Sequence, residues 1–136
     1  MTDREAFRKT IESFYDARAR SELEETLSHV HGDCCFRIVG TPGLKPFTRT
    51  VNSLPEISQS AVDLFEARDL SGLKSISTHI DGDTAYVHRS GTVTFLPTRE
   101  TFESELLDKF VLKDGKIVEY LQFTDTYQIS RIAGIG

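Results

Sequence analysis

The sequence lacks several features that would place the protein in other classes. Among its 136 residues, no apolar run approaches the roughly 20 residues that a membrane-spanning helix needs, so no membrane association is expected. Positive charge is also scarce, because the net charge is −5 and no cluster of Lys and Arg occurs. Proteins that bind nucleic acid usually carry a basic stripe, and no nucleic-acid partner is therefore expected.

Motifs for common organic cofactors are missing too. The sequence contains no P-loop, no G-x-G-x-x-G, no C-x-x-C and no G-x-S-x-G, so no cofactor is predicted. His29 and His31 are expected at a helix end, where side chains two residues apart diverge, and no metal site is predicted there. The N-terminal MTDREAFRKTIESF is charged and amphipathic, unlike a secretory signal, which makes a cytoplasmic location the expectation.

Cysteine is limited to one adjacent pair, Cys34 and Cys35. Neighbouring residues of a strand face opposite sides, so a disulfide between them would require a distorted backbone. Reduced thiols suit a strand that has one side against the core. We therefore expect both cysteines to be free and structural.

The first half of the sequence predicts three helices. Apolar residues recur at a period close to 3.6 over residues 3–20, which predicts an amphipathic helix. Ser21 followed by Glu24 matches a capping box and predicts a second, shorter helix. A third helix is predicted over residues 53–70, with Ser53 as its N-cap.

The second half of the sequence predicts strands. CCFRIV at 34–39 is rich in strand-forming residues, and four further long strands are predicted around a DGD turn at 81–83 and a KDG turn at 113–115. The last strand is predicted to run through KIVEYLQFTDTYQI, residues 116–129. Helices followed by strands, without βαβ alternation, predict an α+β fold in which helices cover one face of a curved sheet.

The length suits one domain, which we place at residues 1–130. The remaining residues, 131–136, are predicted to form a mobile C-terminal tail. No internal repeat or low-complexity segment interrupts the chain.

Three predicted strands each place one charge on an otherwise apolar face. Alternate residues of a strand point to the same side of the sheet. By this parity Arg89 lies on the apolar side of TAYVHRSGTVTF, and Asp108 lies on the apolar side of ELLDKFVL. In LQFTDTYQI, Asp125 shares its parity with Leu121 and Phe123.

These charges allow a structural and a functional interpretation. An isolated buried charge costs several kcal/mol, so Arg89 is expected to pair with Asp108, with Asp125 or with both. The structural interpretation is an ion pair in the core, or a bulge that turns one of these residues outward. The functional interpretation is a pocket whose carboxylates, beside an apolar wall and an arginine, act as a general acid or base. Spacing in the sequence leaves both open.

Several segments together resemble a known superfamily. They are FYDARARSELEETLSHVHGDCCFRIV, GDTAYVHRSGTVTF and ELLDKFVLKDGKIVEYLQFTDT, and they cover most of the chain. In order and spacing they are similar to the nuclear transport factor 2-like superfamily, especially its SnoaL-like, ketosteroid isomerase-like branch. The resemblance implies a cone-shaped α+β barrel, NTF2-like or cystatin-like, made of a curved, mainly antiparallel sheet with three helices in the N-terminal half. It also implies a pocket for a small apolar ligand and a homodimer formed through the outer sheet face.

The resemblance carries the chemistry of ketosteroid isomerases over only in part. The position of their base aspartate corresponds to Ile38. Their oxyanion-hole tyrosine falls at or beside Phe14, with Tyr15 one place away, and their second oxyanion-hole carboxyl corresponds to Asp108. Isomerisation of ketosteroids themselves is therefore not expected.

Two other groups of the same superfamily point to Asp125. Limonene epoxide hydrolase-like members use an arginine and two aspartates, of which Arg89 and Asp125 match. The remaining aspartate falls at Gly91, and Asp108 on a neighbouring strand is a candidate to replace it. SnoaL-like cyclases use an acid/base aspartate on the last strand, which again corresponds to Asp125.

The sequence thus predicts cofactor-independent acid/base chemistry of the isomerase, cyclase or epoxide-hydrolase type on a small apolar carbonyl or epoxide compound. The alternative is a noncatalytic ligand-binding or dimeric interaction module of the same fold. The predicted catalytic residues are Asp125, Asp108 and Arg89. The residues predicted to contact the substrate are Tyr15, Phe14, Phe110, Phe123, Val87 and Ile38.

Overall fold

The computed structural model describes residues 3–44 and 48–132. Its elements are α1 (Asp3–Ala19), α2 (Leu23–Ser28), β1 (Val30–Ile38), a short 3-10 turn (Pro42–Leu44), α3 (Leu54–Ala67), β2 (Arg68–Asp81), β3 (Thr84–Phe95), β4 (Glu100–Lys113), β5 (Lys116–Phe123) and α4 (Thr126–Ile132). Within these residues, no helix is long and apolar enough to cross a membrane.

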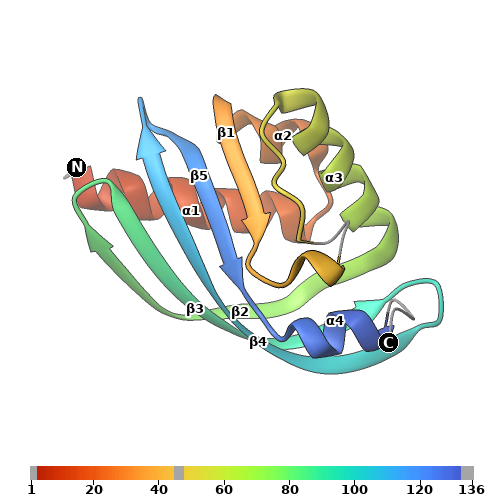
Figure 1. The fold of residues 1–136 in the computed structure, drawn as a ribbon. Helices are drawn as coiled ribbons and strands as arrows, with labels where there is room; N and C mark the ends of the chain where they lie inside the picture. The colour runs from red at the N-terminus through yellow and green to blue at the C-terminus, as the bar shows by residue number, and fades with distance from the viewer. Residues whose placement is uncertain (1–2, 45–47, 133–136) are drawn as a thin grey trace.

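The described strands form one five-stranded sheet in the order β1-β5-β4-β3-β2. The β1–β5 pair is parallel, and every other neighbouring pair is antiparallel. Figure 1 shows that the long strands bend strongly and that α1, α2 and α3 lie on one side of the sheet. The predicted α+β fold with a curved, mainly antiparallel sheet is confirmed. A fourth helix, α4, follows β5 and was not expected.

Two glycines bring β2 and β3 unusually close together where the strands bend. A Cβ atom on Gly91 would lie 2.0 Å from the carbonyl oxygen of Gly72, and one on Gly72 would lie 2.3 Å from that of Thr92. Gly91 also has a φ of +149°, and the pairing register shifts between Asp69 and Gly72. Only glycine accommodates this approach, and such irregularities bend a sheet.

Both hairpin turns form where the sequence predicts them. Asp81 pairs with Thr84 across the first turn, and Gly82 there has a φ of +61°. In the second turn Asp114 and Gly115 have φ values of +55° and +75°. Two central residues with positive φ suit the two-residue turns that follow the twist of antiparallel strands.

The N-cap predicted from the sequence is confirmed for α3 and is wrong for α2. The hydroxyl of Ser53 accepts a hydrogen bond from the backbone N–H of Glu56, as predicted for an N-cap. The capping box predicted at Ser21 is wrong, because Ser21 has a φ of +57° and belongs to the turn after α1. Glu22 is the N-cap of α2 and makes no side-chain cap bond.

The predicted end of the last strand is also wrong. β5 stops at Phe123, and a helix follows in place of a strand that reaches residue 129. The carboxylate of Asp125 accepts a hydrogen bond from the backbone N–H of Gln128 at 3.0 Å, which is helix-capping geometry. The predicted tail begins inside α4, and residues 133–136 lie outside the described part of the chain.

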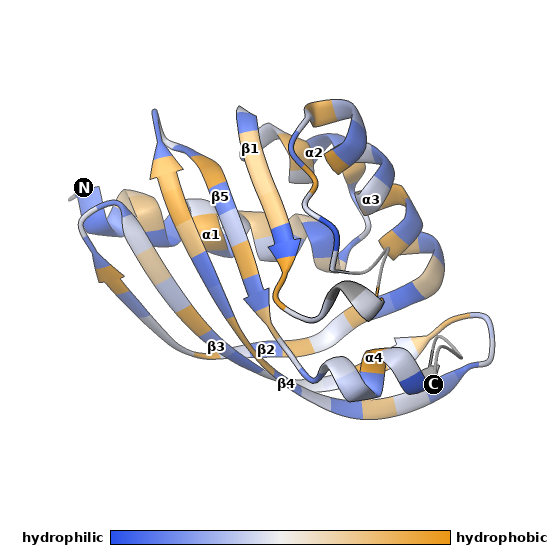
Figure 2. Ribbon diagram, in the orientation of Figure 1, coloured by the Kyte–Doolittle hydropathy of each residue, from blue (hydrophilic) through white to orange (hydrophobic). Residues whose placement is uncertain are grey.

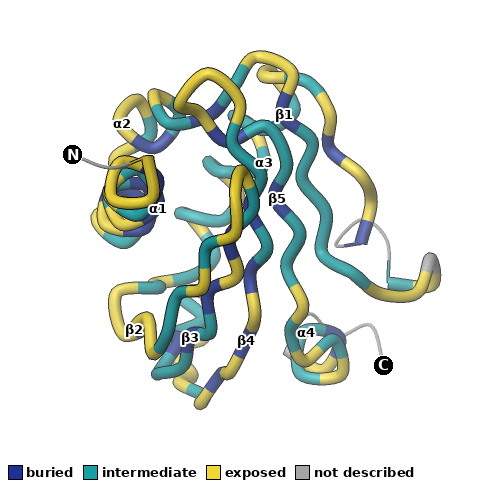
Figure 3. Tube along the Cα trace, turned by 90° about the vertical axis from the view of Figure 1, so that its left-hand side faces the viewer, coloured by how far each residue is buried: buried dark blue, intermediate teal, exposed yellow. Residues whose placement is uncertain are grey.

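The main core lies between α1 and the sheet. Its buried members are Phe7, Ile11, Phe14, Tyr15, Val30, Cys34, Ala85, Val87, Phe110, Ile117 and Tyr120. Apolar and polar residues alternate along β3 and β4 (Figure 2), and the buried residues of α1 face the strands (Figure 3). This alternation is the pattern of strands with one covered face.

Both cysteines are free, as predicted. Cys34 is buried, and this burial raises the pKa of its thiol to about 12. A thiol with so high a pKa stays protonated near neutral pH and is a poor nucleophile. Cys34 therefore acts as a structural residue of the core.

Candidate functional site

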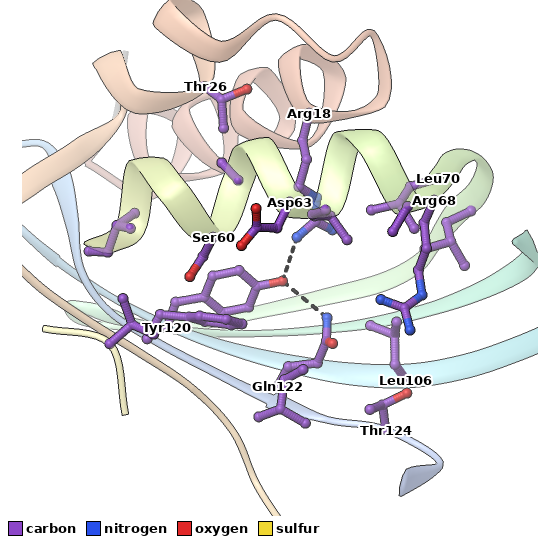
Figure 4. Close-up of a pocket in the computed structure, with 18 of the residues that line it drawn as sticks. Arg18, Thr26, Ser60, Asp63, Arg68, Leu70, Leu106, Tyr120, Gln122 and Thr124 are labelled. Atoms are coloured by element: carbon purple, nitrogen blue, oxygen red, sulfur yellow. Dashed lines mark hydrogen bonds between the residues drawn. The ribbon is translucent and has the colours of Figure 1, made fainter. Parts of the chain in front are cut away.

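A cavity of about 400 Å³ lies between α3, the end of α1 and the inner face of the sheet. Figure 4 shows it with α3 above and the strands below. Its wall is mainly apolar, with contributions such as Phe36 from β1, Leu73 from β2 and Leu106 from β4. Within the described part of the chain, the charged residues that line it are Arg18, Arg49, Asp63 and Arg68.

Asp108 is at the centre of a buried hydrogen-bond network beside this cavity. Its side chain has no exposed surface. The hydroxyl of Tyr15 donates to Oδ2 of Asp108 at 2.5 Å, and that of Tyr120 donates to the same oxygen at 3.1 Å. Gln122 donates from Nε2 to Oδ1 at 3.1 Å. Tyr120 and Gln122 line the cavity and Asp108 does not, so these two side chains separate the carboxyl from a ligand.

The same burial changes the proton affinity of the network. Burial raises the pKa of Asp108, although Arg18 and the hydrogen-bond donors act in the opposite direction. Burial is also the largest cause that raises the pKa of both Tyr15 and Tyr120, so both hydroxyls stay protonated near neutral pH. The tyrosines can therefore act as hydrogen-bond donors.

Arg18 brings a positive charge from α1 into the apolar wall. Its Nη1 donates to the hydroxyl of Tyr120 at 2.8 Å, and its guanidinium lies 5.3 to 5.9 Å from the ring centres of Phe14, Tyr15 and Tyr120. Its Nη2 is buried and has no hydrogen-bond partner among the described residues. Buried donors are rarely left unpaired, which makes this nitrogen a candidate contact for a ligand oxygen.

The predicted pairing of Arg89 with an aspartate is wrong. No ion pair within 4 Å joins Arg89 to Asp108 or Asp125, all three of which are described. Arg89 donates to Ser75 at 3.2 Å and to a backbone oxygen of β2 at 3.3 Å. Its guanidinium lies 3.7 Å from the ring centre of Tyr15, the residue that donates a hydrogen bond to Asp108.

The structure does not bring Asp125 together with the other two predicted catalytic residues. Asp125 is exposed at the start of α4 and borders a separate hollow, which Glu103 and Glu105 also line. It does not line the main cavity. Its placement on an apolar strand face is wrong, because the prediction extended a strand through a segment in which a helix forms.

The residues predicted to contact the substrate fall into three places. Phe14 and Ile38 line the cavity. Tyr15, Val87 and Phe110 are buried in the core and do not line it. Phe123 is 42% exposed and does not line it either. Tyr120 and Gln122 lie on the inner face of β5. Phe123 has the opposite parity and therefore lies on the outer face.

Most of the residues that line the cavity were not predicted, including five polar or charged ones that could contact a ligand, and one of these five had left a signal in the sequence. Arg18 follows Phe7, Ile11 and Phe14 at helical spacing, so the period that predicts α1 also places Arg18 on its buried face. The other four are Asp63, Arg68, Tyr120 and Gln122.

The raised pKa of Asp108 predicts a pH dependence of stability. Above the ordinary value of 3.8, the native protein keeps a proton that the unfolded chain has lost, so stability falls as pH rises toward the folded pKa. The side chain of Asn in Asp108→Asn does not titrate, so this variant lacks the pH-dependent loss of stability. We expect the melting temperature of the wild type minus that of Asp108→Asn to decrease from about pH 4 to about pH 8. A difference that grows over this range would contradict the raised pKa.

Comparison with known proteins identifies the fold. No family model matches the chain, and no curated protein is significantly similar to it in sequence. A Bacillus subtilis protein provisionally assigned as an isomerase has a TM-score of 0.87 at 14% identity and covers 100% of this chain and 98% of its own. An NTF2-like protein of unknown function from Burkholderia pseudomallei has a TM-score of 0.80 at 16% identity, with 96% and 97% covered.

A third structure has a described enzymatic class. It is an LEH-like epoxide hydrolase from M. tuberculosis, with a TM-score of 0.74 at 12% identity, and the match covers 95% of this chain and 96% of the other. The chain therefore has the NTF2-like fold, which it shares with proteins assigned as isomerases and as epoxide hydrolases.

Proposed function

We propose that the protein is a small-molecule enzyme of the isomerase type, which binds a mainly apolar carbonyl compound in the cavity between α3 and the sheet. The observation that carries this proposal is the buried, unpaired Nη2 of Arg18 beside an apolar cavity. A charged donor held in an apolar site stabilises negative charge that develops on a substrate oxygen.

The donor on the cavity wall that suits a carbonyl oxygen is Nη2 of Arg18. Arg18 and Tyr120 are already hydrogen-bonded to each other, and both line the cavity (Figure 4). Tyr120 in turn donates to Asp108, so the buried carboxyl and Gln122 fix the orientation of its hydroxyl. Tyr120 holds Arg18 in place, and a donor that is already oriented needs little reorganisation when the carbonyl oxygen becomes an enolate oxygen.

Asp63 is the candidate base. It projects from α3 and is the one carboxylate among the described residues that line the main cavity. Its carboxylate would remove a proton from the carbon next to the carbonyl group. The electron pair of the broken C–H bond would then form the enolate, whose oxygen contacts Arg18, and the proton would return to carbon in the isomerised product.

A noncatalytic ligand-binding module is the second candidate. Asp108 has no exposed surface and its donors come from the protein itself, an arrangement that also suits a purely structural carboxyl. In this case the cavity would bind a similar ligand without turnover. Proton exchange distinguishes the two candidates.

The expected activity can be measured as exchange of carbon-bound hydrogen. An enzyme that stabilises an enolate also exchanges the protons next to a carbonyl group for deuterium, and 2-tetralone is a suitable small apolar ketone. We expect wild-type protein in D₂O to accelerate this exchange, as followed by NMR. Asp63→Asn, which removes the base, is expected to reduce the acceleration at least about a hundredfold.

The control is Glu66→Gln, which removes an exposed carboxylate from the same helix outside the cavity lining. This variant should exchange 2-tetralone at the wild-type rate. Equal rates for wild type and Asp63→Asn would exclude Asp63 as the base. Binding of 2-tetralone without any accelerated exchange would favour the noncatalytic module.

The outer face of the sheet supports the homodimer that the family resemblance implies. Tyr86, Leu107 and Phe123 are exposed there at 42%, 38% and 42%. Leu107 pairs directly with Phe123 across β4 and β5, so apolar surface is continuous between these strands. The dimer and the cytoplasmic location remain predictions.

A further inference from the structure

Arg68 is a second charged group in the cavity wall. It is the first residue of β2, directly after α3, and it is partly buried. None of the described residues offers its guanidinium a hydrogen bond or a carboxylate within 4 Å, and the guanidinium lies 6.0 Å from the ring centre of Phe95. Burial lowers the pKa of Arg68, and no negative charge in the described part of the chain offsets this effect.

The other charges of the cavity do not neutralise Arg68. Arg49 forms an ion pair with Glu56 at 3.0 Å, and Arg18 is hydrogen-bonded to Tyr120. Asp63 accepts a hydrogen bond from Gln59 at 2.9 Å. The charged lining residues of the described chain are therefore three arginines and one aspartate, although the whole protein has a net charge of −5. The excess of positive charge around the cavity is therefore local and does not reflect the charge of the whole protein.

Arg68 and Arg18 occupy different places along the cavity. Figure 4 shows Arg18 above Tyr120, whereas Arg68 reaches down toward Leu106 and Thr124. The wall is largely apolar, so a ligand that contacts both arginines would need an apolar body. Burial of that body would supply binding energy, and the two guanidinium groups would determine the orientation of the ligand.

We propose that the ligand of this cavity is an apolar carboxylic acid, whose carboxylate binds Arg68 while its carbonyl group lies at Arg18 and Tyr120. This rests on the proposed function, because it takes the same cavity as the site of the carbonyl group. A guanidinium binds a carboxylate through two parallel N–H donors, and the partly buried setting strengthens the pair relative to one in water. A neutral ketone would leave Arg68 without a counter-charge.

A matched pair of ligands tests this proposal by binding alone. 3-Benzoylpropionic acid has a carbonyl group, an aromatic ring and a carboxylate, and its primary amide differs in charge. Isothermal titration calorimetry should show that wild-type protein binds the acid about tenfold more tightly than the amide, or better. In Arg68→Gln the affinity for the acid should fall to the affinity for the amide. The affinity for the amide should stay within about twofold of its wild-type value.

Arg49→Gln is the control, because it removes an arginine from the same wall whose charge is already paired with Glu56. It should retain the preference for the acid. Equal affinities of acid and amide in the wild type, or no binding of the acid, would overturn the proposal. A preference that survives Arg68→Gln would also overturn it, since the carboxylate would then bind elsewhere.

The binding experiment and the exchange experiment fail independently. If wild-type protein prefers the acid through Arg68 but does not exchange the protons of 2-tetralone, the carboxylate site stands and the proposed reaction fails. If exchange depends on Asp63 but acid and amide bind equally, the reaction stands and the carboxylate site fails.

Discussion

Replacement of Asp108 by alanine is expected to lower the free energy of unfolding by about 3–5 kcal/mol. The substitution removes the acceptor that Tyr15, Tyr120 and Gln122 share. The hydroxyl of Tyr15, which is buried and does not line the cavity, would be left without an acceptor, and an unsatisfied buried donor costs about 1–3 kcal/mol. The missing carboxyl group also leaves a void next to Phe110, which has no exposed surface.

Urea unfolding followed by circular dichroism measures this loss. Asp16→Ala is the matched control, because Asp16 is an exposed aspartate of α1 whose ion pair with Arg20 lies at the surface. The control should change the midpoint of unfolding little. A loss of less than about 1 kcal/mol for Asp108→Ala would mean that the network contributes little net stability.

Replacement of Arg18 by methionine is expected to separate activity from stability. Exchange of 2-tetralone protons should fall about 10²- to 10³-fold, because the charged donor for the enolate oxygen is lost. The free energy of unfolding should stay the same or rise, since methionine removes a buried charge and the unpaired Nη2. Tyr120 keeps its contacts with Asp108 and Gln122 in this variant.

The control for Arg18→Met is Arg20→Met, which removes an exposed arginine near the end of the same helix. It should leave the exchange rate unchanged. An unchanged exchange rate in Arg18→Met would place the carbonyl group elsewhere in the cavity. A loss of more than about 2 kcal/mol in stability would make Arg18 a structural residue and favour the noncatalytic module.

Sequence periodicity located buried charges correctly wherever the strands are regular. The residues of β3 and β4 pair without a shift from Thr84 to Phe95, so parity assigns Arg89 and Asp108 to the inner face. The same argument failed for Asp125, because Asp125 and Gln128 have the spacing of a helix cap and α4 begins there. Parity identifies a shared face only while the strand continues.

The cavity residues were harder to predict because their environment is made by distant segments. Asp63 and Arg68 look like ordinary charged residues near the end of α3, and nothing in their immediate neighbours predicts a cavity. They line it because the bend of the sheet leaves a space under α3. Such a space is a property of packing between elements, which periodicity within one element does not report.

The sequence by itself determined the first three helices, the hairpin turns and the faces of the regular strands. These depend on backbone preferences and spacings over a few residues. Only the tertiary structure decided the partners of the buried charges. Tyr15 reaches Asp108 across 93 residues of sequence, and Arg18 reaches Tyr120 across 102. Which polar groups are satisfied, and which are left for a ligand, is therefore settled where these distant segments pack together.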